Sequence, residues 1–304
     1  MITVLSGGVG AARLLAALVT IFDPAEVDAV VNVGDDFVLH GLTICPDLDT
    51  ITYTLAGRVN EETGWGRRGD TWRTMSALGD LGGETWFALG DQDLATHLYR
   101  TQRLGEGATK SEVTREIAAR LAVPITLRPV TDDPLATIID TEFGALDFQD
   151  YFVRRRHDVA VSAVRVRGTE AARPAPGVLA ALHDATRIVI APSNPFLSIE
   201  PILAVPGVRD ALRDRRTDVI AVSPLVGGRA LKGPAARLLD DLGFAVSCEG
   251  VADVYREVVG TLVIDESDAS AAPAIRARGM DVRVTTTVMA NPDHARALAR
   301  TVLA

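Results

Sequence analysis

Cysteine, lysine and long apolar runs are scarce in this 304-residue chain. Cys45 and Cys248, its two cysteines, form neither a CxxC metal pair nor a disulfide framework, so we expect both to be small buried residues. Apolar runs such as residues 188–191 are far too short to span a bilayer. The first residues lack a basic segment followed by an apolar one, so we expect no signal peptide and a cytoplasmic protein that does not bind membranes.

Positive charge is scarce too, with 31 lysines and arginines against 40 acidic residues and a net charge of −9. Such a chain is not expected to bind nucleic acid, which requires a basic face. An anionic small substrate stays possible, because a local site can be positive. Lys110 and Lys232 are the only lysines, so a lysine within a glycine-rich loop, as Lys232 is, becomes a candidate functional residue.

Strand-like and helix-like runs alternate along the chain, which predicts an α/β fold. We expect a mainly parallel sheet with helices on both faces, in a single domain spanning 1–304. Strands are predicted at 2–5, 27–33, 188–191, 219–222 and 282–286, and helices at 11–22, 234–242, 251–259 and 292–303.

Residues 60–165 differ from the rest of the chain, because helix-like and irregular stretches predominate there. We expect them to form an inserted, smaller α+β subdomain whose boundaries are defined to within several residues. A helix is predicted at 109–121, since Thr109 and Glu112 have the spacing of a capping box. Strands are predicted at 125–130, 137–140 and 160–166.

The first predicted strand runs into a glycine-rich loop at residues 6–13. Gly8 and Gly10 would let backbone N–H groups approach a phosphate at a helix N-terminus. The loop is neither a dinucleotide fingerprint, because Arg13 stands at the third glycine position, nor a P-loop, because no Gly-Lys-Ser/Thr follows. A tight strand-to-helix turn is the alternative, and we favour phosphate contact because ligands bind at the carboxyl edge of such sheets.

Four carboxylates in the next two loops suggest a hard cation. Asp35 and Asp36 follow the second strand, and Asp47 and Asp49 precede a helix-like run. Mg²⁺ takes one or two protein carboxylates, with phosphates and water completing its shell. We predict Asp35 and Asp49 as its ligands, while Asp47 could equally cap the helix.

Tryptophans and histidines supply further candidates. Trp65, among glycines and arginines, suits a planar ring site, although such loops are also plain structure. Asp91 is expected to cap a helix that starts near Asp93, and His97 would face the same cleft at helical spacing. His40 lies among the carboxylate loops. Both histidines are also compatible with structural roles.

Two later loops also follow predicted strands. Ser193 and Asn194 could bind a base or sugar, and no GxSxG elbow makes Ser193 a nucleophile. Gly228 and Lys232 belong to a glycine-rich basic loop that is either a diphosphate cradle or a solvated loop. A parallel sheet would gather these loops at one edge, with carboxylates for a metal and donors for phosphates, which is the equipment of phosphoryl transfer.

The motifs together resemble the 2-phospho-L-lactate transferase (CofD-like) family, in family order and over nearly the whole chain. They are Gly7-Gly8-Val9-Gly10, Asn32-Val33-Gly34-Asp35-Asp36, His40-Gly41-Leu42, Pro46-Asp47-Leu48-Asp49-Thr50, Gly64-Trp65-Gly66, the run 89–97, the run 191–195, and the glycines and lysine of 223–233. Ala11 departs from the family, which more often has a third glycine there.

The resemblance implies a Rossmann-like α/β core in a single catalytic domain, 1–304, and a magnesium-dependent reaction in coenzyme F-420 biosynthesis. The ribityl hydroxyl of the deazaflavin Fo would attack the phosphate next to the acid group of a guanosine diphosphate (GDP)-linked donor, and guanosine monophosphate (GMP) would leave. Asp35 and Asp49 would hold the metal and position the hydroxyl. The residues expected to contact substrate are Gly8, Gly10, Asp36, His40, Trp65, Asp91, His97, Ser193, Asn194, Gly228 and Lys232.

Alternatives stay open at this point. Lactyl, enolpyruvyl and glyceryl donors are not separated by any motif, and a homodimer is only the family expectation. A non-catalytic nucleotide-sugar sensor, resembling the gluconeogenesis-factor-like regulators, shares the glycine-rich start. A nicotinamide dehydrogenase is disfavoured by Arg13 at the third glycine position.

Overall fold

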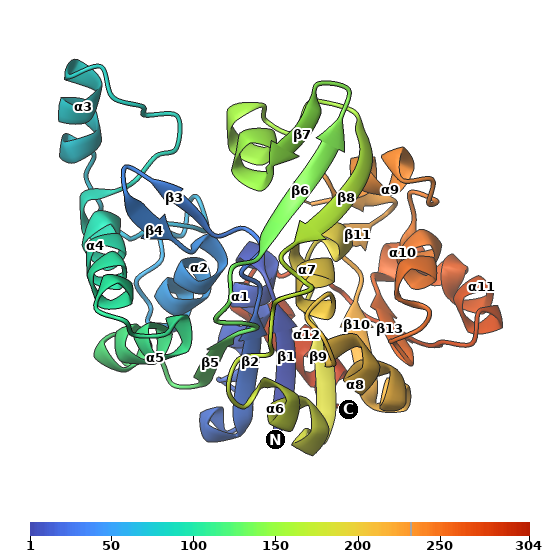
Figure 1. The fold of residues 1–304 in the computed structure, drawn as a ribbon. Helices are drawn as coiled ribbons and strands as arrows, with labels where there is room; N and C mark the ends of the chain where they lie inside the picture. Colours follow the sequence, from blue (N-terminus) through green and yellow to red (C-terminus); the bar gives the residue numbers. More distant parts are fainter. Residues whose placement is uncertain (232) are drawn as a thin grey trace.

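The structure, a computed structural model, describes residues 1–231 and 233–304, and it is built on a seven-stranded parallel sheet (Figure 1). The strand order is β14-β13-β10-β9-β1-β2-β5, and each neighbouring pair is parallel. The bounds are β1 Ile2–Ser6, β2 Val27–Val31, β5 Thr126–Pro129, β9 Arg187–Ile190, β10 Val219–Val222, β13 Thr261–Ile264 and β14 Asp281–Val284. This confirms the predicted Rossmann-like α/β class.

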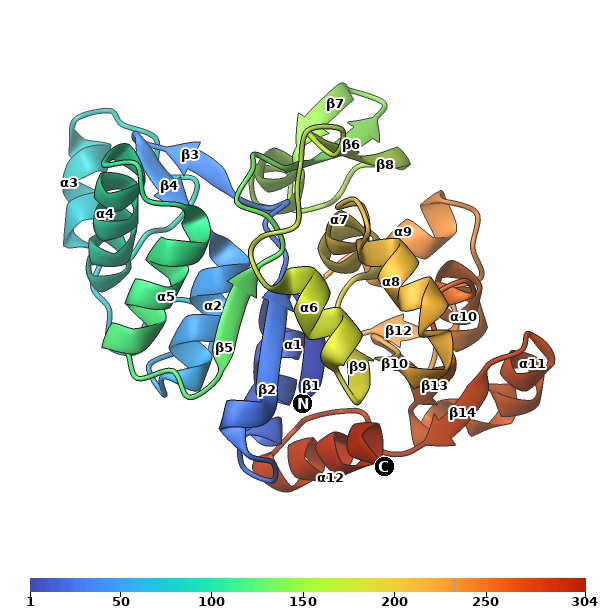
Figure 2. The same cartoon turned by 60° about the horizontal axis from the view of Figure 1, so that its bottom comes forward.

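The central strands are apolar and buried on both faces, as strands covered by helices must be. Helices α6 and α8 lie in front of the strands in Figure 2, whereas α1 lies behind them and packs with α12. The helices are α1 Gly8–Leu18, α2 Pro46–Leu55, α3 Arg73–Asp80, α4 Asp91–Gly105, α5 Lys110–Arg120, α6 Val178–Asp184, α7 Glu200–Leu203, α8 Val208–Asp214, α9 Ala235–Asp241, α10 Cys248–Tyr255, α11 Ala272–Ala277 and α12 Pro292–Leu303.

The order of the strands reverses between β1 and β9. From β1 the chain first builds outward through β2 and β5, and it then returns to the other side of β1 for β9, β10, β13 and β14. The loops after β1 and β9 therefore leave the same carboxyl edge side by side. Ligands of open α/β sheets bind in the crevice at such a switch point.

Two inserted segments, one before and one after β5 in the sequence, lie outside the main sheet. Between β2 and β5 lie α2 to α5 and the hairpin of β3 Phe37–Leu39 and β4 Leu42–Ile44. Between β5 and β9 lies a small antiparallel sheet of β7 Gly144–Asp147, β6 Ala136–Thr141 and β8 Val161–Arg167, seen above the main sheet in Figure 1. The predicted insertion at 60–165 is thus interrupted by β5, which pairs with β2 in the main sheet.

Local capping explains where several helices begin. Thr109 and Glu112 form the predicted capping box at the start of α5. Helix α10 begins earlier than predicted, at Cys248, because the Ser247 side chain accepts from the Gly250 N–H. Both cysteines are buried. No helix within 1–231 or 233–304 is long and apolar enough to cross a membrane.

The start of α4 corrects the prediction for Asp91. Asp91 is the first residue of α4 and not its cap, and Asp70 accepts the N–H groups of Gln92 and Asp93 instead. The Asp91 carboxylate caps α3, where it accepts from Arg73 and Thr74. The Thr71 hydroxyl, followed by the Thr74 N–H, lowers the pKa of Asp91 to about 2.

Close contact between the loops after β1 and β9 requires a glycine at position 10. A methyl group on Gly10 would lie 2.3 Å from the Pro192 carbonyl oxygen, which is backbone and cannot yield cheaply. We expect Gly10→Ala to lower the free energy of unfolding by about 1–3 kcal/mol, measured by urea denaturation. Gly105→Ala, where a methyl group meets nothing within 4 Å, is the matched control and should cost nothing. Equal effects of the two substitutions would contradict the packing argument.

Candidate functional site

A cavity of about 940 Å³ opens at the carboxyl edge of the sheet, at the switch point between β1 and β9. Loops after β1, β2, β9 and β10 all contribute to its wall, as do α2 and α4. Among the described residues, its charged or titratable lining consists of Arg13, Asp35, Asp47, Asp49, Asp93, His97, His157 and Tyr53. The predicted gathering of the loops at one edge is therefore what the structure has.

Asp47 ties three segments of the cavity wall together. Its Oδ1 accepts from the Gly8 N–H at 2.8 Å, and its Oδ2 accepts from the Asn32 side chain at 2.9 Å. Asn32 in turn accepts the Gly34 N–H at 2.8 Å. The α1 N-terminus thus donates one of its free N–H groups to a carboxylate in the first turn of α2, and the Gly8 N–H is not free for a phosphate.

Asp35 is a buried carboxylate with one oxygen that no described group hydrogen-bonds. Its Oδ1 has no hydrogen-bond partner among the described atoms, and its side chain lines the cavity. Burial, followed by the neighbouring Asp47 carboxylate, raises the pKa of Asp35 well above its ordinary value. Burial also raises the pKa of Asp47 to about 6, against hydrogen bonds from Asn32 and Gly8. Two buried carboxylates this close require protons or a cation.

Asp49 faces a different neighbour from Asp47, although both lie in the first turn of α2. Residues two apart on a helix point in different directions. Asp49 forms a two-pronged ion pair with Arg100 of α4, and both side chains are buried. His97 lies between Asp49 and Asp93, which accepts the Tyr53 hydroxyl at 2.7 Å.

Most hydrogen-bonding groups of the Ser193 and Asn194 side chains bind backbone groups of the protein. The Ser193 hydroxyl donates to the Gly7 carbonyl at 2.7 Å, which joins the loops after β1 and β9. Asn194 Oδ1 accepts from Phe196 and Leu197 at the start of a helical turn. Asn194 Nδ2 remains buried and without a partner in the part of the chain that the structure describes, so one donor is left for a ligand.

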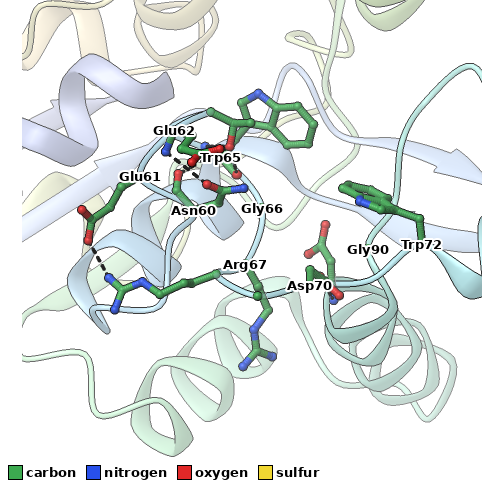
Figure 3. Close-up of a pocket in the computed structure, with 13 residues that line it drawn as sticks. Asn60, Glu61, Glu62, Trp65, Gly66, Arg67, Asp70, Trp72 and Gly90 are labelled. Atoms are coloured by element: carbon green, nitrogen blue, oxygen red, sulfur yellow. Dashed lines mark hydrogen bonds and ion pairs between the residues drawn. The ribbon is translucent and has the colours of Figure 1, made fainter.

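Five tryptophan and phenylalanine rings line the cavity. They are Trp65, Trp86, Phe87, Phe148 and Phe152. Trp65 is 44% exposed and also lines a side pocket of about 510 Å³ with Arg67, Asp70 and Trp72. Figure 3 shows the two indoles, both from the loop between α2 and α3, around this side pocket. A planar ring can therefore find aromatic surface at the rim of the main cavity.

Several predicted site residues lie outside both cavity linings. Asp36 forms an ion pair with Lys110 at 2.6 Å, and burial nevertheless raises its pKa. His40 is exposed, with a φ of 53°, in the two-residue turn between β3 and β4. Gly228 lies in the corresponding turn between β11 Leu225–Val226 and β12 Arg229–Ala230. These turns need positive φ at both central residues, which explains both motifs structurally. Lys232 lies outside the described residues.

Sequence reasoning missed Arg100, Tyr53 and Asp93 as members of the site. A signal existed for two of them: Asp93, His97 and Arg100 stand at i, i+4 and i+7, which places them on one helix face. Tyr53 carries no such signal, because its contact with Asp93 joins α2 to α4 across the cavity wall.

The comparison with known families decides the family. A sequence model described as "2-phospho-L-lactate transferase CofD" matches residues 2–303. The chain belongs to the CofD family. The resemblance seen in the motifs is thereby confirmed, and the chain is an enzyme that transfers a phospho-acid group. The family acts in coenzyme F-420 biosynthesis.

Relatives that carry two different names are similar to this CofD-family chain along nearly its whole length. A "Phosphoenolpyruvate transferase" of Streptomyces griseus is 41% identical over 99% of this chain and 97% of its own. A "2-phospho-L-lactate transferase" of Methanothermobacter thermautotrophicus is 40% identical over 100% and 97%. The chain is thus nearly equally similar to relatives that carry the two names.

The fold also has a solved counterpart. A protein of Bacillus halodurans superimposes with a TM-score of 0.68 over 100% of this chain and 99% of its own, at 17% identity. At that identity the likeness concerns the fold alone.

The raised pKa of Asp35 predicts a pH-dependent stability. Above the ordinary carboxylate pKa of about 4, the unfolded chain releases a proton that folded Asp35 retains, so wild-type stability falls as the pH rises towards the folded pKa. Asparagine does not titrate. We therefore compare the melting temperature of Asp35→Asn with that of wild type in magnesium-free buffer. The variant value minus the wild-type value should be larger at pH 8 than at pH 5 by at least about 2 °C.

Asp140→Asn is the control for this comparison. Arg165 lowers the pKa of Asp140, so this carboxylate is ionised in both states between pH 5 and pH 8. Its difference from wild type should stay constant over that range. A constant difference for Asp35→Asn as well would contradict the buried carboxylate pair.

Proposed function

We propose that this CofD-family enzyme transfers a 2-phospholactyl, phosphoenolpyruvyl or phosphoglyceryl group from a GDP-linked donor to the ribityl hydroxyl of the deazaflavin Fo, in the cytoplasm. GMP leaves, and coenzyme F-420-0 or its dehydro form is the product. The observation that supports this most is the cavity of about 940 Å³ at the switch point, where carboxylates, the Asn194 amide and aromatic rings meet. Its volume lies at the upper end of those usual for ligand sites, which suits two substrates.

We propose Mg²⁺ as the cofactor, held by Asp35 and Asp49. The buried, unpartnered oxygen of Asp35 beside the Asp47 carboxylate fits a hard cation, because such a charge pair is costly without one. Asp49 lines the same cavity, and each of its oxygens keeps a lone pair after bonding Arg100. When bound, the metal would neutralise charge on the diphosphate as the bond to GMP breaks.

The residues of the chain would mainly position and neutralise. Arg13, on α1, lines the cavity and could pair with the anionic donor. Asn194 Nδ2, which no described residue bonds, is a donor available beside the loop after β1. Ser193 and Asp47 hold that loop in place through Gly7 and Gly8. Phosphoryl transfer depends on this kind of positioning more than on a covalent intermediate.

The acceptor ring is proposed to lie against Trp65. This indole is exposed at the junction of the main cavity and the side pocket of Figure 3, where a tricyclic ring can stack while its ribityl chain reaches the carboxylates. A homodimer is proposed only as the common arrangement of such enzymes.

The proposed reaction can be tested with purified protein, Fo, Mg²⁺ and each of the three donors. Mass spectrometry should detect GMP and one coupled product, and the donor that reacts fastest identifies the acid. A folded protein that binds guanine nucleotides but yields no product with any donor would contradict the transferase and favour a nucleotide-sugar sensor.

Removing one metal ligand charge should abolish turnover. We expect Asp49→Asn to lose about 100-fold in kcat, because the metal loses an anionic ligand while asparagine retains an oxygen for Arg100. Thermal unfolding verifies that the variant is folded, and Asp140→Asn serves as the surface control. Wild-type kcat in Asp49→Asn at every Mg²⁺ concentration would overturn the ligand assignment.

A further inference from the structure

The ring of His97 is held between two groups that select its tautomer. Arg100 Nη1 lies 3.2 Å from His97 Nδ1, and a guanidinium can only donate hydrogen bonds. Nδ1 must therefore be an acceptor without a proton, since a proton there would set two donors against each other. On the other side, Nε2 lies 3.4 Å from an Asp93 carboxylate oxygen, which favours a proton on Nε2. Both contacts select the Nε2–H form.

Arg100 is itself fixed. It is 3% exposed, donates to both oxygens of Asp49, and reaches the Thr43 carbonyl at 3.3 Å. Rotation away from His97 would leave the buried Asp49 carboxylate unpaired, which is strongly unfavourable. The side chain that selects the tautomer is thus anchored by a second element, α2, and not by α4 alone.

The Nε2–H group then has no well-aligned hydrogen-bond acceptor among the described residues. Nε2 has no hydrogen-bond partner there, although His97 is 1% exposed and lines the cavity. Tyr53 occupies one oxygen of Asp93 at 2.7 Å, and the other oxygen is poorly aligned with the ring. A buried donor without a partner at a cavity wall is a group that a ligand can satisfy.

We propose that Arg100 is a positioning residue that holds His97 as the Nε2–H tautomer, so that His97 donates a hydrogen bond to a substrate oxygen in the cavity. In this form His97 is not a general base. It is not a metal ligand either, although ligand atoms of Asp49, Asp93 and His97 lie within 4.8 Å of one another. The substrate bond rests on the proposed function, whereas the tautomer rests on the geometry alone.

Nuclear magnetic resonance of the wild-type protein tests the tautomer directly. With ¹⁵N-labelled histidine, the signal that disappears in His97→Gln identifies His97 among the five histidines. We expect a protonated Nε2 and a bare Nδ1, unchanged when Mg²⁺ is added. A protonated Nδ1, or a bare Nε2 that shifts with Mg²⁺, would overturn the proposal.

Paired amide substitutions test the donated hydrogen bond. The glutamine amide nitrogen reaches the position of Nε2, whereas that of asparagine reaches only the position of Nδ1. We expect His97→Gln to keep kcat/KM within about tenfold of wild type and His97→Asn to lose about 100-fold, the usual effect of removing one donor. Equal losses in the two variants would overturn the donor role.

Arg100→Met tests the positioning role, with Arg103→Met as the control on the same helix. Arg103 is ion-paired with Glu116 at 2.9 Å but lies away from the cavity lining. Arg100→Met should release a mixture of His97 tautomers and lower kcat, whereas Arg103→Met should do neither. A single Nε2–H form in folded Arg100→Met would overturn the role of Arg100. If wild type reacts with no donor, the proposed function and the substrate bond fall together, and the spectrum still decides the tautomer.

Discussion

The hydrogen bonds of one buried carboxylate, Asp47, hold the site in its shape. Asp47 joins the first turn of α2 to the start of α1 and to the Asn32 side chain after β2. Burial raises the pKa of this carboxyl group to about 6, so its hydrogen bonds compete with a tendency to stay protonated. Asp47 binds the start of the glycine-rich loop through the Gly8 N–H, and the Ser193 hydroxyl binds the same loop from the other side through the Gly7 carbonyl.

The same constraint separates two polar regions within one cavity. Asp35 and Asp47 form an acidic pair that has no compensating charge among the described residues, whereas Asp49 is compensated by Arg100. In our proposal, Asp35 and Asp49 together hold the cation, and His97, which lies beside Asp49, presents the fixed donor. A transferase that moves a phosphoryl group between two oxygens requires both kinds of stabilisation, and neither requires a covalent nucleophile.

Much of the fold could be predicted from the sequence, because it depends on local patterns. Short apolar runs predicted five strands of the main sheet, and the spacing of Thr109 and Glu112 predicted the cap of α5. The sheet to which β5 belongs was harder to predict. The sequence of a four-residue strand that follows helices is the same whether the strand joins the main sheet or a smaller one. Only its pairing with β2 decides that question.

The family and the type of chemistry were determined by the sequence itself, since motif identity and order are properties of the chain. The roles of individual residues were decided by tertiary structure. His40 and Gly228 proved to occupy hairpin turns, Asp36 pairs with Lys110, and Asp91 caps a neighbouring helix. A polar residue in a motif can serve the backbone or a ligand, and the choice depends on which groups from distant segments lie within hydrogen-bonding distance. That distance is set by packing, which one-dimensional spacing does not contain.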